Sequence, residues 1–320
     1  MYKILITRYV PEEFIDPALR EKVEFVFPPT PDTLWTEKDW AEYGKDCDAL
    51  LTVLTKATKE MMAANPQFKV IGTVSVGYDH IDVAGATELG RPVVNTPNAV
   101  THATAELTIA MMLDMVRQTR KNETQARTDL FCKHGFMTTG MHTLEGKTLG
   151  IIGFGRIGQD VARKARAFDM DIVYNQRHQL DAQLEAKYDA KYLGLEELLK
   201  TSDVVCLNCP LTPETRGLIN EERIALMKDG SYIVNMARGP VVCEDAVVAA
   251  LKSGKLAGAA FDVHEFEPKI NPELAKMDNV SIQPHVGTGT EETRKNIFSE
   301  VVTGIIACLD GEVPYNRVNK

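Results

Sequence analysis

Short apolar runs alternate with longer amphipathic segments along almost the whole chain. The runs have the length of buried strands, and helices fit between most of them. The expected strands cover residues 3–7, 23–27, 49–53, 69–73, 92–95, 148–152, 172–174, 204–208, 232–235, 258–262 and 280–282. Alternation of this kind predicts an α/β fold in which parallel sheets are joined by helical crossovers.

The longest helical signal runs from Ala103 to about Glu123, with Thr101 as its expected cap. Its apolar face consists of Leu107, Met111, Met112, Met115 and Val116. We expect these methionines to pack in a core or a subunit contact. The next segment, 128–147, lacks clear periodicity and is expected to be a loop that links this helix to the next domain.

The length of the chain and its C-terminal pattern bear on the domain organisation. A chain of 320 residues is long enough for about two domains. A helix is expected over 291–309 and is followed by a short tail. If that tail packs back on the first domain, the first domain is discontinuous, with residues 1–99 and 288–320. Residues 100–287 then form a second, continuous domain inserted into it.

Composition excludes several classes of protein. The chain has 44% hydrophobic and 25% charged residues, as an ordinary globular protein does. Its net charge of -9 argues against nucleic acid as the main partner. No apolar run approaches the length of a membrane span, and the N-terminus lacks a signal peptide. Cys206 and Cys209 form a CxxC inside an apolar run, so we expect buried thiols rather than a metal or redox site. These features predict a cytoplasmic protein.

The segment "KTLGIIGFGRIGQDVARKARAF" (147–168) places a glycine pattern between an apolar strand and an amphipathic helix. In this pattern Gly153 allows a tight turn, Gly155 lets the backbone approach a pyrophosphate, and Gly158 lets the helix pack on the strand. The helix N-terminus adds free N–H groups and a positive dipole end. The sequence therefore predicts a dinucleotide-binding loop.

Three further segments place reactive side chains directly after expected strands. Arg238 lies in "VNMARGPVV", a histidine and three acids lie in "FDVHEFEP", and His285 lies in "SIQPHVGTG". Ligands bind beyond the carboxyl ends of strands in open α/β sheets. An arginine grips a carboxylate, a histidine moves a proton, and an acid orients the histidine. Together with a nicotinamide, this set predicts hydride transfer between the cofactor and the carbonyl carbon of a 2-oxo acid.

At this point the sequence resembles the D-2-hydroxyacid dehydrogenase family over nearly its whole length. The stretches that carry the resemblance are "TVSVGYDHIDVAGATELG" (73–90), "VVNTPNAVTHATAEL" (93–107), "GKTLGIIGFGRIGQDVARKA" (146–165), "NMARGPVVCEDAVVAALKSGKLAGAAFDVHEFEP" (235–268) and "PHVGTGT" (284–290). The resemblance implies two Rossmann-like, doubly wound domains: a dinucleotide-binding domain inserted into a discontinuous, flavodoxin-like substrate domain. It also implies a homodimer.

The resemblance also assigns catalytic roles. Arg238 is expected to bind the substrate carboxylate, His285 to exchange a proton with the substrate oxygen, and Glu267, rather than Glu265, to be the partner of His285. The family commonly has an aromatic residue where His264 stands, and His264 is not expected to be the catalytic histidine. Positions implied to contact substrate are Val53, Leu54, Val76, Gly77, Arg238 and His285.

The same resemblance implies a set of cofactor-binding positions. These are Thr104, Gly153, Gly155, Arg156, Ile157, Gly158, Gln176, Arg177, Cys209, Pro210, Thr215, Met236, Ala237, Arg238, Asp262, His285 and Gly287. The family often carries a tryptophan shortly before the strand of the glycine loop. The segment "TDLFCKHGF" (128–136) has none.

The stretch "DIVYNQRHQ" (171–179) bears on the cofactor's 2′ position. Members of the family that prefer NAD usually end this strand with an aspartate, and Gln176 occupies that position here. Gln176 removes the repulsion of a 2′-phosphate, and Arg177 supplies a cation suited to bind it. We therefore expect NADP to be favoured over NAD, with use of both as the alternative.

Two other functions stay open at this stage. One is the oxidation of phosphoglycerate, although members with that activity often carry an added regulatory domain. The other is a dehydrogenase-like corepressor, a binding protein that senses a dinucleotide and keeps the same arginine, glutamate and histidine. Formate oxidation is disfavoured because that branch lacks the glutamate partner of the histidine, which is present here as Glu267.

Overall fold

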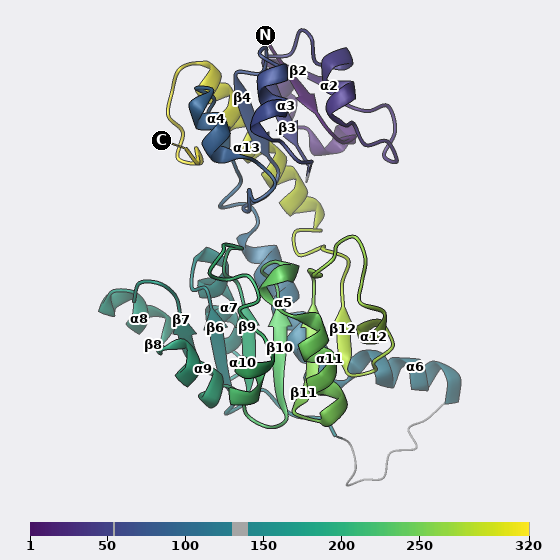
Figure 1. Cartoon of the computed structure of the whole chain (residues 1–320), viewed down its shortest axis with the longest axis vertical. Helices are drawn as coiled ribbons and strands as arrows, with labels where there is room; N and C mark the ends of the chain where they lie inside the picture. Colours follow the sequence, from purple (N-terminus) through teal and green to yellow (C-terminus); the bar gives the residue numbers. More distant parts are fainter. Residues whose placement is uncertain (54, 130–139, 320) are drawn as a thin grey trace. The chain divides into compact units, whose positions relative to one another are not determined.

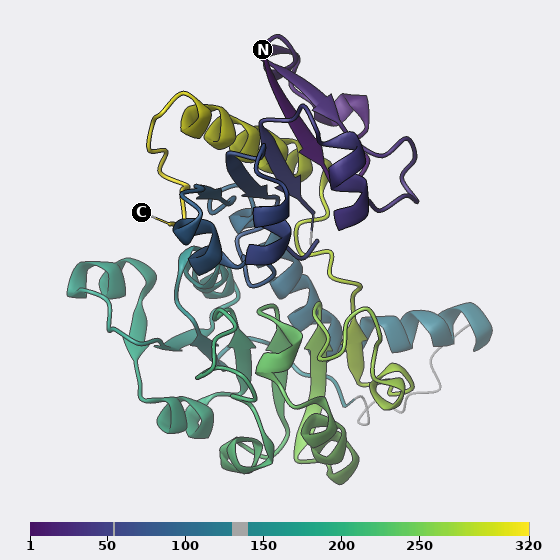
Figure 2. The same cartoon turned by 45° about the horizontal axis from the view of Figure 1, so that its top comes forward.

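A computed structural model describes residues 1–53, 55–129 and 140–319 of the chain (Figures 1 and 2). The chain forms two compact units. Unit 1 contains Met1–Val100 and Thr288–Lys320, and unit 2 contains Thr101–Gly287. Each unit is an α/β fold built on a parallel sheet, so the predicted fold class is confirmed.

Unit 1 is built on a five-stranded parallel sheet with the order β2-β1-β3-β4-β5. Its strands are β1 (Tyr2–Ile6), β2 (Val23–Val26), β3 (Ala49–Thr52), β4 (Val70–Thr73) and β5 (Val93–Val94). Its helices are η1 (Glu12–Phe14), α1 (Pro17–Arg20), α2 (Glu37–Tyr43), α3 (Lys59–Ala64), α4 (Val83–Glu88) and α13 (Glu291–Leu309). This strand order is that of a flavodoxin-like doubly wound fold.

Both faces of the unit 1 sheet are covered, because strand residues point alternately to opposite sides. On one face Ile4, Ile6 and Leu51 pack in a cluster with Val301 and Ile305 of α13. On the other face Leu5, Leu50 and Ile71 pack with residues of α2, α3 and α4. Parallel strands buried on both faces explain why these runs read as continuous apolar segments.

The C-terminal tail returns to the edge of this sheet. Val94 forms an isolated antiparallel bridge with Arg317. The Asn319 side chain accepts a hydrogen bond from the backbone N–H of Val93 at 2.7 Å, and the Asn316 side chain donates to the carbonyl of Asn95 at 3.0 Å. These bonds hold the end of the chain on unit 1.

Unit 2 is built on a seven-stranded parallel sheet with the order β12-β11-β10-β9-β6-β7-β8 (Figure 1). Its strands are β6 (Thr148–Ile152), β7 (Asp171–Asn175), β8 (Ala190–Tyr192), β9 (Val204–Leu207), β10 (Ser231–Asn235), β11 (Leu256–Phe261) and β12 (Val280–Ile282). Its helices are α5 (Thr101–Arg117), α6 (Thr119–Asp129), α7 (Arg156–Arg166), α8 (Ala182–Tyr188), α9 (Leu195–Thr201), α10 (Glu221–Leu226), η2 (Gly239–Val241), α11 (Glu244–Ser253) and α12 (Pro272–Ala275).

The strand order of unit 2 reverses between β6 and β9. From β6 the chain continues to β7 and β8 on one side, and then crosses to β9, β10, β11 and β12 on the other. In open α/β sheets such a switch point, at the carboxyl ends of the strands, is where ligands bind. All seven strands are parallel, so every loop that follows a strand lies at this same edge.

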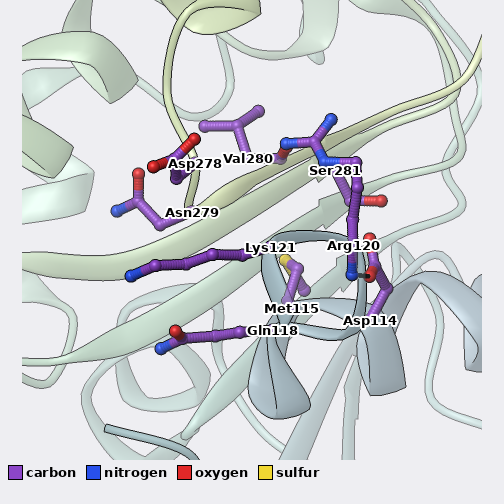
Figure 3. A pocket seen from close by; sticks show the side chains of 9 residues that line it. All are labelled: Asp114, Met115, Gln118, Arg120, Lys121, Asp278, Asn279, Val280 and Ser281. Carbon is purple, nitrogen blue, oxygen red and sulfur yellow. Dashed lines mark hydrogen bonds between the residues drawn. The ribbon is translucent and has the colours of Figure 1, made fainter. Parts of the chain in front are cut away.

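The helices and strands predicted for unit 2 need three corrections. The single helix predicted from Ala103 to Glu123 is two helices, because Gln118 takes a left-handed conformation with φ of 51°. The Asp114 carboxylate accepts hydrogen bonds from the Thr119 hydroxyl and the Arg120 N–H, which begin α6 (Figure 3). Thr101, the predicted cap, is instead the first helical residue.

The Arg120 side chain crosses from α6 to the start of β12, where it donates to the carbonyl of Val280 (Figure 3). The small pocket there holds only about 10 Å³ and lies at the amino end of β12, away from the ligand-binding edge.

The third correction is β8, a short strand with an exposed Lys191 that the sequence did not predict. Of the predicted 128–147 loop, residues 130–139 lie outside the described residues, and Thr128 and Asp129 belong to the end of α6 instead.

Candidate active site

The glycine loop lies at the switch point, between β6 and α7. Gly153 has φ of +93°, and a Cβ there would lie 2.5 Å from the backbone nitrogen of Cys209. A Cβ on Gly158 would lie 2.4 Å from the carbonyl oxygen of Gly153. Both positions therefore require glycine for packing of the fold itself.

Gly155 differs from the other two glycines, because a Cβ there would meet no atom within 4 Å. It is the N-cap of α7, and no side chain caps this end of the helix. Arg156 and Ile157 are the first helical residues. The positive end of the helix dipole therefore faces open space beside Gly155, which has no side chain. This arrangement fits a bound pyrophosphate.

Residues predicted to lie beside the adenosine follow β7 and β9. The Gln176 side chain donates to the carbonyl of His178 at 2.8 Å, and Arg177 is exposed. The pKa of Glu214 is lowered mainly by hydrogen bonds from Thr212 and from its own backbone, and to a smaller extent by the positive charge of Arg177. Arg177 is thus electrostatically coupled to Glu214, in the loop after β9.

That loop is fixed by its own hydrogen bonds. The Thr215 hydroxyl donates to the carbonyl of Pro210 at 2.7 Å and accepts from the N–H of Thr212 at 2.8 Å. Cys209 is buried, and burial raises the pKa of its thiol to about 11. Cys206 is fully buried with a pKa of about 12 for the same reason. Within the described residues no group of three or more His, Cys, Asp or Glu side chains is arranged to hold a metal ion.

Arg238 follows β10 in a turn held by a buried asparagine. The Asn235 side chain accepts from the N–H of Ala237 and donates to the carbonyl of Arg238, each at 3.1 Å. The guanidinium of Arg238 donates to the carbonyl of Ala237 at 2.9 Å. The turn therefore fixes the backbone from which Arg238 extends. The sequence did not predict this role for Asn235. The only indication in the sequence is that Asn235 is a polar residue at the end of an apolar strand.

Glu267 and His285, which follow β11 and β12, form a hydrogen-bonded pair. Glu267 Oε2 lies 3.1 Å from His285 Nδ1, with side chains 38% and 30% exposed. Burial disfavours the charged carboxylate. The hydrogen bonds from His285 and the His264 N–H, and the charges of the two rings, outweigh burial and hold the pKa of Glu267 below its usual value. His285 has φ of 58°, a left-handed conformation that costs energy in a residue with a side chain.

The other predicted nicotinamide residues gather beside this pair. Asp262 is buried, and its carboxylate accepts from the N–H groups of Val286 and Gly287 at 2.7 and 2.8 Å. A Cβ on Gly287 would lie 2.9 Å from Asp262 and 3.5 Å from both Met236 and Thr104. Asp262 thus holds the backbone that follows His285, and the buried Thr104 and Met236 line the same place.

Of the positions predicted to contact substrate in unit 1, Leu54 lies outside the described residues. Val53, together with Val74, lines a cavity of about 200 Å³ whose walls are mostly apolar. Val76 and Gly77 form a loop whose carbonyls accept from the Asn95 side chain at 2.9 Å and the Ser75 hydroxyl at 2.6 Å. These bonds fix the orientation of the loop's peptide groups.

The comparisons with known proteins now decide the family. The family model described as "D-isomer specific 2-hydroxyacid dehydrogenase, NAD binding domain" matches residues 109–287, which is more than half of the chain. The chain belongs to this family. The match spans the glycine loop, Arg238, Glu267 and His285, and it makes the protein an oxidoreductase with a nicotinamide-dinucleotide domain.

Individual relatives agree over the full length. A glyoxylate reductase from Pyrococcus furiosus is 42% identical, covering 99% of this chain and 95% of its own. The crystal structure of a glyoxylate reductase from Paecilomyes thermophila is 36% identical with a TM-score of 0.88, covering 99% of this chain and 98% of its own. A D-lactate dehydrogenase from Aquifex aeolicus, crystallised with NAD and lactic acid, is 32% identical with a TM-score of 0.85, covering 99% of each chain.

No described helix has both the length and the apolar character of a membrane span.

Proposed function

We propose that this dehydrogenase reduces a small 2-oxo acid to the D-2-hydroxy acid, with His285 as the proton donor. The observation that carries the proposal is the Glu267–His285 pair at 3.1 Å, placed on the ligand-binding edge of the sheet that also carries Arg238 and the glycine loop. When bound, a nicotinamide cofactor supplies the hydride.

The geometry of the pair supports this role for His285. Because Nδ1 of His285 is paired with Glu267, its Nε2 is the nitrogen left to face a substrate. In reduction Nε2 gives its proton to the oxygen that was the 2-oxo group, and in oxidation it takes that proton back. The Glu267 carboxylate keeps the ring in the required tautomer and stabilises the imidazolium.

Arg238 is proposed to hold the substrate carboxylate through two parallel hydrogen bonds. In unit 1, the backbone N–H groups of Val76 and Gly77 are proposed to bind a substrate carboxylate, and the apolar cavity beside Val53 to accept the substrate's tail. Two of the three relatives described above are named glyoxylate reductases, which supports a 2-oxo acid with a short tail or none.

For the cofactor we propose NADP over NAD. Support comes from Gln176, a neutral residue at the end of β7, and from Arg177, which is exposed beside it. Neither repels a 2′-phosphate, and the guanidinium can bind one. Because one relative was crystallised with NAD, dual use of the two cofactors is the alternative to be measured.

The test is a screen of 2-oxo acids with NADPH and NADH, following the loss of cofactor absorbance. Glyoxylate, hydroxypyruvate, phosphohydroxypyruvate and branched or aromatic 2-oxo acids form the panel. We expect turnover of a small 2-oxo acid with higher kcat/KM for NADPH. Preference for the phosphorylated acid supports the phosphoglycerate reaction instead. Tight NADPH binding without turnover of any acid supports a binding protein. The same sample, analysed by sedimentation, tests the proposed homodimer.

A further inference from the structure

His264 contacts all three catalytic segments, although it is not itself placed to meet a substrate. Its side chain is 4% exposed. Its backbone N–H donates to Glu267 Oε1 at 2.9 Å. Its ring Nε2 lies 2.9 Å from the carbonyl oxygen of Gln283, two residues before His285. Because a carbonyl only accepts hydrogen bonds, Nε2 carries a proton.

The segment that carries Arg238 is packed against the same residue. A Cβ on Gly239 would lie 1.8 Å from the carbonyl oxygen of His264 and 2.5 Å from the nitrogen of Glu265. The backbone directly after Arg238 therefore lies in close contact with the His264–Glu265 peptide. A shift of His264 would be transmitted to Arg238, Glu267 and His285 together.

A buried carboxylate faces the other nitrogen of the ring. Glu244, in the first turn of α11, is 1% exposed, and its Oε1 lies 3.7 Å from His264 Nδ1. Oε1 also accepts from the N–H of Glu265, and the Glu265 carboxylate accepts from the N–H of Glu244, each at 2.9 Å. Glu244 Oε2 and His264 Nδ1 are both buried without a hydrogen-bond partner among the described residues.

This geometry requires a proton between the two side chains. With Nε2 protonated, a neutral ring would direct the lone pair of Nδ1 at a carboxylate, and two buried acceptors facing each other are unfavourable. A proton on Nδ1 converts this contact into a buried ion pair. The ring is the only cation at that carboxylate among the ion pairs of the described residues.

We propose that His264 is a positioning residue, whose imidazolium, paired with the buried Glu244 carboxylate, holds the Arg238, Glu267 and His285 segments in their catalytic arrangement. This inference rests on the proposed roles of those three residues. It assigns to Glu244 and His264 a positioning role that is separate from the catalytic roles proposed for Arg238, Glu267 and His285.

The electrostatics around the ring agree with its being charged. The ionisable groups that act on it are Glu244 from α11 and Glu267 from its own loop. Burial favours the neutral ring, but the hydrogen bonds and charges of Glu244, Gln283 and Glu267 outweigh burial and raise the pKa of His264 above its usual value. The charge on His264 in turn helps to hold the pKa of Glu267 low.

The experiment compares wild type with His264→Phe, Glu244→Gln and a matched control, His142→Phe, which replaces an exposed histidine of the same unit. Turnover of the best 2-oxo acid is measured from pH 4 to 9. We expect His264→Phe to lower kcat roughly 10- to 100-fold with the Kd for NADPH within about twofold. In His264→Phe the acid limb of the kcat profile should move to higher pH, because Glu267 loses a neighbouring positive charge. In Glu244→Gln the acid limb should stay near that of wild type, because His264 is still protonated where Glu267 titrates. His142→Phe should match wild type.

Histidine ring NMR adds a measurement that does not depend on turnover. In wild type the His264 signal, identified by its absence in His264→Phe, should titrate above the usual pKa of about 6.5, and in Glu244→Gln it should return toward that value. The His285 signal, identified with His285→Gln, should change chemical shift in His264→Phe and not in His142→Phe. If no 2-oxo acid is turned over, the proposed function fails while these ring signals still test the positioning role.

Two results overturn the inference. One is a His264 ring that titrates at or below the usual histidine value in wild type. The other is a folded His264→Phe enzyme with kcat within twofold of wild type and an unmoved acid limb. If His264→Phe does not fold, Glu244→Gln, which keeps the size of the side chain, decides by the His264 titration, and a His264 pKa unchanged by this substitution overturns the inference.

Discussion

Two parts of the same sheet edge in unit 2 are built on different principles. The loop between β6 and α7 is made of backbone: Gly153 and Gly158 are glycine because no Cβ fits, and Gly155 leaves open space before a helix end. The segments after β10, β11 and β12 are made of side chains, with buried Asp262, His264 and Glu244 holding the residues proposed to react. The first part is proposed to bind the dinucleotide through backbone groups in an open space. The second part keeps charged side chains in fixed positions.

The largest effect should come from removing the proton donor. We expect His285→Ala to lower kcat roughly 10²- to 10⁴-fold, the usual contribution of a positioned acid–base group. Because His285 lies on the charged part of the edge and the glycine loop is proposed to bind the dinucleotide through its backbone, the Kd for NADPH should stay within a few-fold. Stopped-flow turnover and fluorescence titration measure the two quantities. Equal losses in binding and turnover would contradict the division of labour proposed for the two parts.

A pair of glycine variants tests the same comparison directly. Gly239→Ala introduces a Cβ 1.8 Å from a backbone oxygen, so we expect a loss of more than about 3 kcal/mol in the free energy of unfolding, or failure to fold. In Gly155→Ala the new Cβ meets no atom within 4 Å, so the free energy of unfolding should stay within about 1 kcal/mol of the wild-type value. It should nevertheless bind NADPH more weakly, because the Cβ occupies the space proposed for the pyrophosphate. Urea unfolding and cofactor titration check both.

If Gly155→Ala unfolded as easily as Gly239→Ala, the loop would depend on packing as much as the catalytic segments do. The contrast drawn between a backbone-built and a side-chain-built half would then be wrong.

The two parts also differ in how far the sequence reveals them. The strand, glycine pattern and helix of the nucleotide loop are contiguous, so β6 was predicted with its observed bounds. The strands of both sheets were predicted apart from β8, whose three residues include an exposed lysine. Arg238, Glu267 and His285 each stand directly after an apolar strand, and that position made them candidates.

What the sequence concealed depends on contacts between distant residues. The break between α5 and α6 is set by Asp114 bonding to Thr119 and Arg120, and no glycine or proline marks it. Glu244 and His264 meet only because α11 and the loop after β11 pack together. The family commonly has an aromatic residue where His264 stands, so the sequence shows His264 as a departure. The sequence does not show that Glu244 is its partner.

A smaller effect is expected at the outer end of the nucleotide half. Gln176→Asp places a negative charge where a 2′-phosphate is proposed to bind. A charge-assisted hydrogen bond contributes roughly 1.5–3 kcal/mol, so the ratio of kcat/KM for NADPH over NADH should fall by about one to two decades. Gln183→Asp, which adds the same charge on an exposed position of α8, is the control. A wild type that uses NADH as well as NADPH would refute the preference.

The smallest effect concerns the pH dependence of stability in the charged half. A histidine whose folded pKa is raised contributes stability that is present below the unfolded value of about 6.5 and is lost as pH rises through the folded pKa. His264 has a raised pKa, so the wild-type Tm should fall between pH 6 and 9 more than that of the double variant His264→Phe/Glu244→Gln, which has neither charge. Glu267 has a lowered pKa and acts in the opposite direction, losing its contribution only as pH drops below about 4.3.

The two contributions therefore occupy separate pH windows, and a scan above pH 6 reports on His264 without Glu267. The expected difference is a few degrees, since roughly 2–4 °C corresponds to 1 kcal/mol for domains of 150–250 residues. Calorimetry at pH 6, 7.5 and 9 measures it. Gly155→Ala, altered in the backbone-built half, should follow the wild-type pH dependence. Parallel curves for wild type and the double variant would mean that folding does not raise the pKa of His264.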